Sequence, residues 1–298
     1  MNRTKKIIAK AFIVIIKLVG NLPFSFNRKI GYLVGLIIRI TNSRMYCTTK
    51  TNIDICYPNL SSQDKKKLIK KACHNIGLNF AEMTWFWQRD IESLNKRVTT
   101  VKGIELFEEY KKKNKGVVVV GLHLGNWELL FNWLPQYTDL AIMHRGISLK
   151  ELADYVIEKR SRTGATMLEG RRENVARMRE QLHNGDVLLT LHDQEPLAGS
   201  GLFSTFYGVP VYTMLTAMKL AKKTGAEVVL ATFVRNKEGY EANFERVELD
   251  FQNLELQALA DEFNRLFEQQ INKCPEQYQW SYKRFKSTVD GSPNPYIK

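Results

Sequence analysis

The chain has 298 residues, of which 44% are hydrophobic and 25% charged, so it can bury a sizeable core and is not disordered throughout. Its four cysteines include no CxxC pair, which argues against a disulfide framework or a cysteine zinc site and fits a reducing compartment. The length suits one large α/β domain or two smaller domains.

The formal net charge of +13 is concentrated at the amino terminus. Residues 1–50 hold ten Lys and Arg residues and no Asp or Glu, whereas the other 248 residues hold 34 basic and 31 acidic groups. A nucleic-acid partner would require basic residues spread over a binding face, so this distribution argues against one. Because the same segment is strongly apolar, the pattern favours an anionic membrane surface as a partner.

Residues 1–45 are expected to form a membrane-associating helical segment. Five polar residues of its first helix fall within about 60° of one another on a helical wheel. They are Arg3, Lys6, Lys10, Lys17 and Asn21. A narrow basic stripe on a mostly apolar helix is typical of a helix that lies in a membrane interface.

Other interpretations of this segment are a cleaved signal peptide, a transit peptide and a tilted spanning helix. Lys10 and Lys17 split the apolar core that a signal peptide needs, and no A-x-A-like cleavage site follows. A transit peptide is usually rich in Arg and Ser. No run of about 18 uncharged apolar residues is present, but a tilted single-pass helix with snorkelling lysines stays open.

Residues 46–298 are expected to form one α/β domain. Helical periodicity first covers 61–87 and 104–113, and strand-like and helix-like segments then alternate. The expected strands are 116–122, 140–144, 165–168, 187–192 and 227–234, and the expected helices are 127–134, 150–163, 172–183, 213–224 and 254–273. This order predicts an α/β fold with a mainly parallel sheet flanked by helices, which carries its site at the carboxyl ends of strands.

The stretch H-L-G-N-W-E at 123–128 is the most informative. A buried strand ends at His123, Gly125 permits a tight turn, and Asn126 can cap the helix that Glu128 enters. On one continuous helix His123 and Glu128 would point about 140° apart. Across a strand–turn–helix junction they can converge, so that Glu128 holds one ring nitrogen and leaves the other as a base. The alternative is a structural histidine at a strand end.

Five sequence blocks follow one another between residues 123 and 286. They read H-L-G-N-W-E at 123–128, R-S-R-T-G at 160–164, D-Q at 193–194, G-L-F-S-T-F-Y-G-V-P at 201–210, and P-E-Q-Y-Q-W at 275–280 followed by R-F-K at 284–286. These blocks resemble the motifs of the lipid A biosynthesis acyltransferase family, the late lauroyl and myristoyl transferases of Gram-negative bacteria. One departure is His144-Arg145-Gly146, where the family usually shows Tyr-Arg-Pro.

The resemblance implies a glycerolipid-acyltransferase-like fold and an enzyme at the cytoplasmic face of the inner membrane. It would move a fatty acyl chain from acyl carrier protein or coenzyme A to a hydroxyl of a lipid A precursor or another glycolipid. His123 would be the general base and Glu128 would orient it. No cofactor and no metal is expected, because the chain lacks a P-loop and an H-E-x-x-H site.

The resemblance also suggests substrate-binding residues. Arg145, Arg160 and Arg162 are candidates for the phosphates of the acceptor, and Arg160 is expected to matter more, with Arg162 in a surface salt bridge. For each arginine alone, a surface salt bridge is the competing interpretation. Asp193 could orient a hydroxyl or an arginine, or could simply cap a helix or turn.

Three aromatic residues, Phe203, Phe206 and Tyr207, could line an acyl or lipid groove, or could be core aromatics beside a turn. Two other functions stay open. One is a lipid thioesterase or phospholipase in which the His123–Glu128 pair activates water. The other is a non-catalytic lipid-binding protein, which should tolerate the loss of His123.

Overall fold

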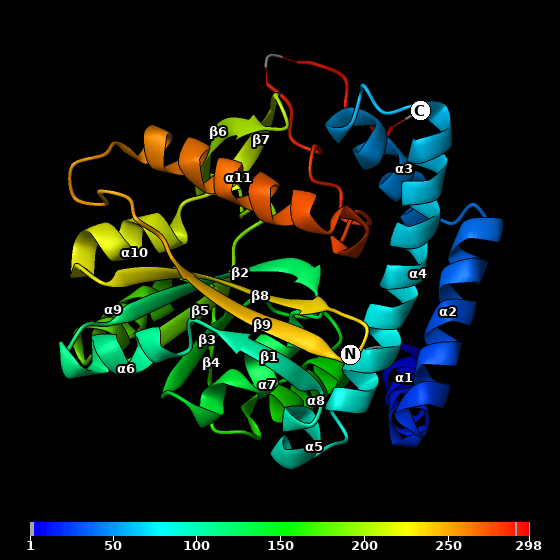
Figure 1. Ribbon diagram of the computed structural model, residues 1–298, viewed down its shortest axis with the longest axis horizontal. Coiled ribbons are helices and arrows are strands. Elements are labelled where there is room, and N and C mark those ends of the chain that lie inside the picture. The colour runs from blue at the N-terminus through cyan, green and yellow to red at the C-terminus, as the bar shows by residue number, and fades with distance from the viewer. Residues whose placement is uncertain (1–2, 290, 298) are drawn as a thin grey trace.

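The computed structural model describes residues 3–289 and 291–297, in which a seven-stranded sheet has helices on both faces (Figure 1). The strand order is β1-β9-β8-β2-β5-β3-β4. The strands are β1 (Val98–Lys102), β2 (Val117–Gly125), β3 (Leu140–His144), β4 (Thr166–Glu169), β5 (Val187–Leu191), β8 (Glu227–Arg235) and β9 (Tyr240–Arg246). Strands β8, β2, β5, β3 and β4 run parallel, and only the β8–β9 pair is antiparallel. The predicted α/β fold with a mainly parallel sheet is confirmed.

Strand β2 is central because its sequence is apolar on both faces. Val117 to Val120 are all buried, as expected of a strand covered from both sides. Gly121 lets the side chains of Leu130 and Leu191 pack directly on the strand, because a Cβ there would lie 2.7 Å from a methyl group of each.

Helices cover the two faces of the sheet around separate apolar cores. The core that contains Val118 and Val120 also contains residues of α9 (Val175–His183), α10 (Thr216–Thr224) and α11 (Leu256–Lys273). The core that contains Val117 and Val119 takes in α6 (Glu105–Lys112) and α7 (Glu128–Asn132), and α8 (Lys150–Ser161) packs on α7. Figure 1 shows α10 and α11 on one side of the sheet and α7 and α8 on the other.

A small antiparallel hairpin stands apart from the sheet. It consists of β6 (Gly201–Phe206) and β7 (Val209–Met214), and β6 packs against α11. The expected helix 213–224 is therefore wrong at its start, since β7 takes Thr213 and Met214 and α10 begins at Thr216.

Four helices precede the sheet: α1 (Arg3–Asn21), α2 (Phe24–Ile40), α3 (Arg44–Cys56) and α4 (Ser62–Phe86). The first three all pack on α4, which runs across the end of the sheet at which the β2 arrow ends (Figure 1). Helices α2 and α4 touch backbone to backbone, because a Cβ on Gly77 would collide with the Gly31 carbonyl and with Gly35. The domain boundary predicted at residue 45 falls at the second residue of α3 and stays a prediction.

Helices α1 and α2 carry a large set of exposed apolar side chains. They are Ile7, Ile8, Phe12, Val14, Ile15, Leu18, Phe26, Tyr32, Leu33, Leu36, Ile37 and Ile40. Within residues 3–289 and 291–297, none of the helices combines the length and the apolar character needed to cross a membrane. A short fifth helix, α5 (Ile91–Asn95), links α4 to β1.

Candidate active site

His123 and Asp193 meet at the carboxyl ends of β2 and β5. Nδ1 of His123 lies 2.8 Å from Oδ1 of Asp193, and the His123 backbone N–H donates to Oδ2 at 3.1 Å. The register of the two strands brings them together, since Gly121 pairs with Leu191 and the next amide, of His192, donates to the Gly121 carbonyl. Asp193 therefore holds both the ring and the backbone of His123.

The environment of Asp193 favours its charged form. Burial by itself raises the pKa of this carboxyl. The charge of His123 and the hydrogen bonds from its ring and its amide act in the opposite direction and hold the pKa of Asp193 below its ordinary value. An ionised Asp193 accepts a hydrogen bond from Nδ1–H of His123, and in the tautomer that this contact selects, Nε2 carries the lone pair.

Nε2 of His123 has no hydrogen-bond partner in the described part of the chain, and the side chain is 15% exposed. The ring packs against Trp127, with ring centroids 5.0 Å apart. Trp127 in turn lines an apolar cleft whose other wall is α4. That wall consists of Ile76, Asn79, Phe80 and Met83, and Gln279 closes the cleft. A basic nitrogen thus lies beside an apolar cleft.

The C-terminal segment completes the site from outside the sheet. The backbone N–H of Gln279 donates to the His123 carbonyl at 2.9 Å. Leu124 and Tyr278 form an isolated antiparallel β-bridge. Burial, the charge of Asp193 and a hydrogen bond to Asp193 raise the pKa of Tyr278 well above its ordinary value. Tyr278 therefore remains a neutral hydroxyl that supports the ionised Asp193.

Glu128 does not hold His123, so the predicted contact between them is wrong. Its carboxylate accepts two hydrogen bonds from Arg160 at 2.8 Å, through Nε and Nη2, and one from Trp87 Nε1 at 2.7 Å. The chain turns at Gly125, with φ +62°, before α7 begins, and this carries Glu128 to the side of α8. Because Glu128 is 1% exposed, its charge requires the paired guanidinium.

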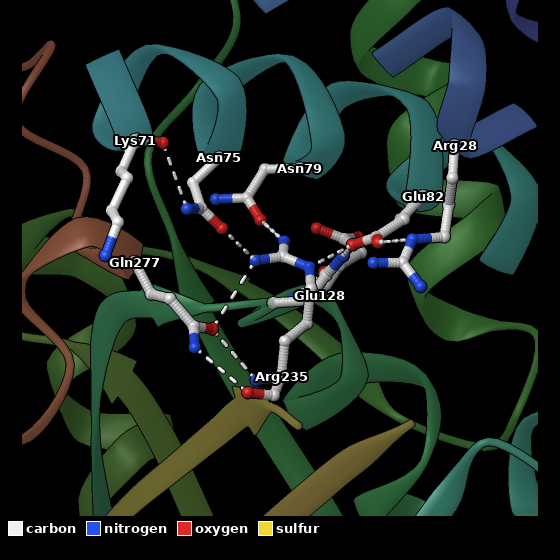
Figure 2. Close-up of polar contacts among 9 residues, drawn as sticks. Arg28, Lys71, Asn75, Asn79, Glu82, Glu128, Arg235 and Gln277 are labelled. Atoms are coloured by element: carbon white, nitrogen blue, oxygen red, sulfur yellow. Dashed lines mark hydrogen bonds and ion pairs between the residues drawn. The ribbon is translucent and has the colours of Figure 1, made fainter. Parts of the chain in front are cut away.

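A second buried acid anchors the same turn to α4. Glu82 accepts from Arg235 at 2.6 Å and from Asn126 at 3.2 Å, and Oδ1 of Asn126 accepts from the Glu128 amide at 3.3 Å (Figure 2). Asn75, Asn79 and Gln277 accept the other hydrogen bonds of the Arg235 guanidinium. The turn that follows His123 is therefore tied to two buried ion pairs, through Asn126 to Glu82–Arg235 and through Glu128 to Arg160.

Comparison with known proteins decides the family. The family model of the bacterial lipid A biosynthesis acyltransferase matches residues 1–287. The chain belongs to the bacterial lipid A biosynthesis acyltransferase family. Among its relatives, the lipid A biosynthesis palmitoleoyltransferase of Escherichia coli (strain K12) is 26% identical over 282 residues, 93% of this chain and 90% of the relative. The lipid A biosynthesis lauroyltransferase of the same strain is 25% identical over 292 residues, 94% of this chain and 91% of the relative.

A third relative, a lipid A biosynthesis acyltransferase of Haemophilus influenzae (strain ATCC 51907 / DSM 11121 / KW20 / Rd), is 24% identical over 284 residues, 90% of this chain and 87% of the relative. Membership in the lipid A biosynthesis acyltransferase family makes the protein an acyltransferase. The resemblance drawn from the five sequence blocks is confirmed.

The three arginines predicted to bind phosphate occupy different settings in this acyltransferase. Arg145 is exposed in the loop after β3 and pairs with no described side chain. Arg160 is 18% exposed and occupied by Glu128. Arg162 donates to the Phe86 carbonyl at 2.7 Å and to Asn132 at 3.3 Å, both neutral acceptors, so the predicted salt bridge of Arg162 is wrong.

The aromatic block of the lipid A acyltransferase motif lies on the hairpin and does not line the cleft beside His123. Phe206 is 1% exposed and packs on Tyr207 and Phe285, so the prediction that it lines an open groove is wrong. The Tyr207 hydroxyl lies 3.0 Å from the Tyr57 hydroxyl. The Phe203 ring packs at a tilt against the Tyr212 ring, with ring centroids 5.4 Å apart. A substrate role for Phe203 or Tyr207 stays a prediction.

The cleft residues on α4 were missed by sequence reasoning. Ile76, Phe80 and Met83 repeat at helical spacing on one face, which is the pattern of an ordinary core helix. The aromatic run M-T-W-F-W at 83–87, which ends the same helix, is also typical of a core helix. Phe80 alone breaks that pattern, because it is a large apolar side chain exposed in the middle of the helix.

Proposed function

We propose that this acyltransferase moves a fatty acyl chain from an acyl thioester, on acyl carrier protein or coenzyme A, to a hydroxyl of a lipid A precursor or related glycolipid. The single observation that carries the proposal is the His123–Asp193 pair, with a free Nε2 beside the apolar cleft. Family membership and the names of the relatives support the acceptor class.

In the proposed reaction, Nε2 of His123 takes the proton of the acceptor hydroxyl while the hydroxyl oxygen attacks the thioester carbonyl. Asp193 holds the Nδ1 proton and stabilises the imidazolium that forms. The tetrahedral intermediate then expels the thiolate, and the imidazolium returns its proton to the sulfur. One C–O bond forms, one C–S bond breaks, and no covalent enzyme intermediate is required.

The acyl chain of the donor is proposed to lie against the apolar wall formed by α4 and Trp127, where the cleft of about 20 Å³ would have to widen to admit it. Ile76, Phe80 and Met83 give the cleft an apolar wall, which suits a hydrocarbon chain. In this position the thioester end of the chain would lie beside His123, a proposal supported by Trp127, which contacts both the cleft and the His123 ring.

Membrane attachment through α1 and α2 at the cytoplasmic face of the inner membrane is part of the proposal. Their exposed apolar side chains would insert among lipids, and Lys10, Lys17 and Lys29 would face anionic headgroups. Arg145 is the arginine of the predicted set that remains available for an acceptor phosphate.

The proposal is tested by mass spectrometry of the product. Purified protein is mixed with a defined acyl thioester and a lipid A precursor, and a mass gain of one acyl chain on the glycolipid is expected. His183→Ala is the matched control, because His183 is exposed at the end of α9. Donor hydrolysis at the same rate with and without glycolipid would favour a thioesterase instead. Full product formation by His123→Ala would show that His123 is not the general base.

A further inference from the structure

A polar groove lies between α2, α4 and the C-terminal segment. Arg28 and Tyr32 of α2, Lys71 and His74 of α4, and Arg235 at the end of β8 contribute to its lining. Figure 2 shows Arg28 and Lys71 at opposite sides of the view with Arg235 between them. The groove therefore carries a basic side chain at each end and a third in its wall.

The lining of the groove is dominated by cations. Arg28, Lys71 and Arg235 face a single lining acid, Glu276. Arg235 is 6% exposed and paired with Glu82, which Arg28 also approaches at 3.3 Å. Even with Glu82 counted, the groove retains an excess of positive charge.

Two of these cations have hydrogen-bond donors to spare. The Lys71 ammonium contacts no acid and no acceptor in residues 3–289 and 291–297. Arg28 approaches Glu82 through Nε, and its two terminal nitrogens donate to no described residue. Unpaired guanidinium and ammonium donors are the groups that bind phosphate oxygens.

His74 also lines the groove, and positively charged side chains lie near it. Burial and the charges of Arg39 and Lys70 lower the pKa of His74 below its ordinary value. The ring is therefore neutral near pH 7 and can share a hydrogen bond with an anion. An anion in the groove would be attracted by Arg39 and Lys70 as well as by the lining cations.

The groove is separate from the cleft beside His123. Along α4, the groove residues Lys71, His74 and Leu78 and the cleft residues Ile76 and Met83 lie roughly 120° to 180° apart around the helix axis. The buried hydrogen bonds from Arg235 to Asn75 and Asn79 form the wall between the two. A ligand can therefore occupy the groove without touching His123.

The groove also borders the exposed apolar face of α2. Tyr32 lines the groove, and the neighbouring Leu33, Leu36 and Ile37 are exposed. A ligand with a phosphate and a hydrocarbon chain would match both surfaces. A free anion would use only the groove.

We propose that this groove binds the phosphate of an anionic membrane lipid, at a site distinct from the transfer site. The lipid tails would lie against α2, so the proposal rests in part on the membrane attachment proposed above. The bound lipid would fix α2 and α4 relative to the bilayer and so hold the cleft at a set height above the hydrocarbon.

Isothermal titration calorimetry of the full chain in non-ionic detergent tests the site, with dihexanoyl phosphatidate, inorganic phosphate and hexanoate as probes. Dihexanoyl phosphatidate should bind more tightly than either of the others. Lys71→Gln should weaken its binding about tenfold, since a hydrogen-bonded charge is lost. Lys66→Gln is the matched control, because Lys66 is exposed on α4 about 140° from Lys71 and should bind like the wild type.

Arg28→Gln should weaken binding of dihexanoyl phosphatidate by a similar factor. Near-ultraviolet circular dichroism checks that this variant is folded. The test of the proposal rests on the Lys71 variant, because Lys71 is exposed. His123→Ala should bind normally, which separates the fate of this site from that of the transfer reaction. Inorganic phosphate binding as tightly as the lipid would make this a free-anion site and overturn the proposal. An equal loss in Lys66→Gln, a loss in His123→Ala, or no binding of dihexanoyl phosphatidate would also overturn it.

Discussion

Asp193 takes the place that the sequence pattern had given to Glu128. It lies 70 positions after His123, yet the parallel pairing of β2 and β5 brings its carboxylate within 2.8 Å of the ring. Glu128, five positions from His123, lies instead against Arg160 and Trp87. Nearness along the chain was a poor guide here, because a turn at Gly125 separates the two side chains.

The first prediction concerns Asp193. Asp193→Asn should lower the rate of acyl transfer by about 10²–10⁴-fold, because the amide cannot stabilise an imidazolium as a carboxylate does. Steady-state kinetics with a defined acyl thioester measure the loss, and Asp154→Asn on the exposed face of α8 is the control. A near-normal rate for Asp193→Asn would mean that His123 does not depend on this contact.

The second prediction concerns the Glu128–Arg160 pair. Glu128→Ala should lower the free energy of unfolding by about 3–5 kcal/mol, because it leaves a largely buried guanidinium without its partner. Glu128→Gln with Arg160→Gln should lose less than the sum of the two single changes in a double-mutant cycle by urea unfolding. Additive losses would show that the two side chains act separately. A loss of activity without a loss of stability would restore a catalytic role for Glu128.

The third prediction concerns the His192 ring, which is fully buried. Its Nε2–H donates to the Met214 carbonyl at 2.9 Å, and its Nδ1 has no hydrogen-bond partner among the described groups. Burial lowers its pKa from 6.5 to about 4. Between these values the unfolded chain binds a proton and the native chain does not. Stability should therefore fall by about 3 kcal/mol as the pH drops through this window.

His192→Gln keeps a donor for the Met214 carbonyl and removes the titration. Unfolding measured from pH 7 to pH 4 should show a shallower decline for this variant than for the wild type. Equal slopes for the variant and the wild type would mean that His192 has the same protonation state, or the same pKa, in the folded and the unfolded chain.

Helices α2 and α4 depend on glycines for their close approach. Gly77→Ala should destabilise the protein by about 1–3 kcal/mol, although alanine favours helix, because its Cβ would collide with the Gly31 carbonyl. Gly170→Ala is the matched control, since a Cβ there meets only ordinary contacts. Urea unfolding gives both values, and an unchanged stability for Gly77→Ala would show that the helices separate without cost.

Strands with continuous apolar runs could be predicted from the sequence, because a strand buried on both faces has no polar positions. The strand 140–144 was found with its exact ends, and 187–192 ended one residue late. Strand β9 reads Y-E-A-N-F-E-R and was missed, because its charged residues interrupt the apolar run that marked the other strands. The hairpin at 201–214 was also missed, and it forms a separate two-stranded sheet outside the main one.

The site was predicted in part. His123 could be recognised because a valine run ends at it and a turn follows. Its partner and the α4 wall of the cleft could not, because both depend on tertiary packing of segments 40 to 70 positions away. Of the arginines, Arg160 could not be separated from Arg162 without the position of Glu128.

At the scale of the whole molecule, the apolar surface of α1 and α2 predicts membrane binding. Ile15→Gln combined with Leu36→Gln should reduce flotation with anionic vesicles by about tenfold or more, since each side chain contributes about 1.5–3 kcal/mol when buried. Ile147→Gln combined with Leu197→Gln removes two other exposed apolar side chains and is the control. Deletion of residues 1–45 is less informative, because it also uncovers α4.

Equal flotation of the two double variants would place the membrane contact elsewhere. Release of the wild type by high salt would favour an interfacial attachment, whereas release by detergent alone would favour a spanning helix.

The central claim is that His123 is the base for acyl transfer at the end of β2. The most direct test is the single-turnover rate of transfer from a defined acyl thioester to a lipid A precursor by folded His123→Ala in detergent. We expect a rate about 10²–10⁴-fold below that of the wild type, with unchanged thermal stability. A rate within a few-fold of the wild type would contradict it.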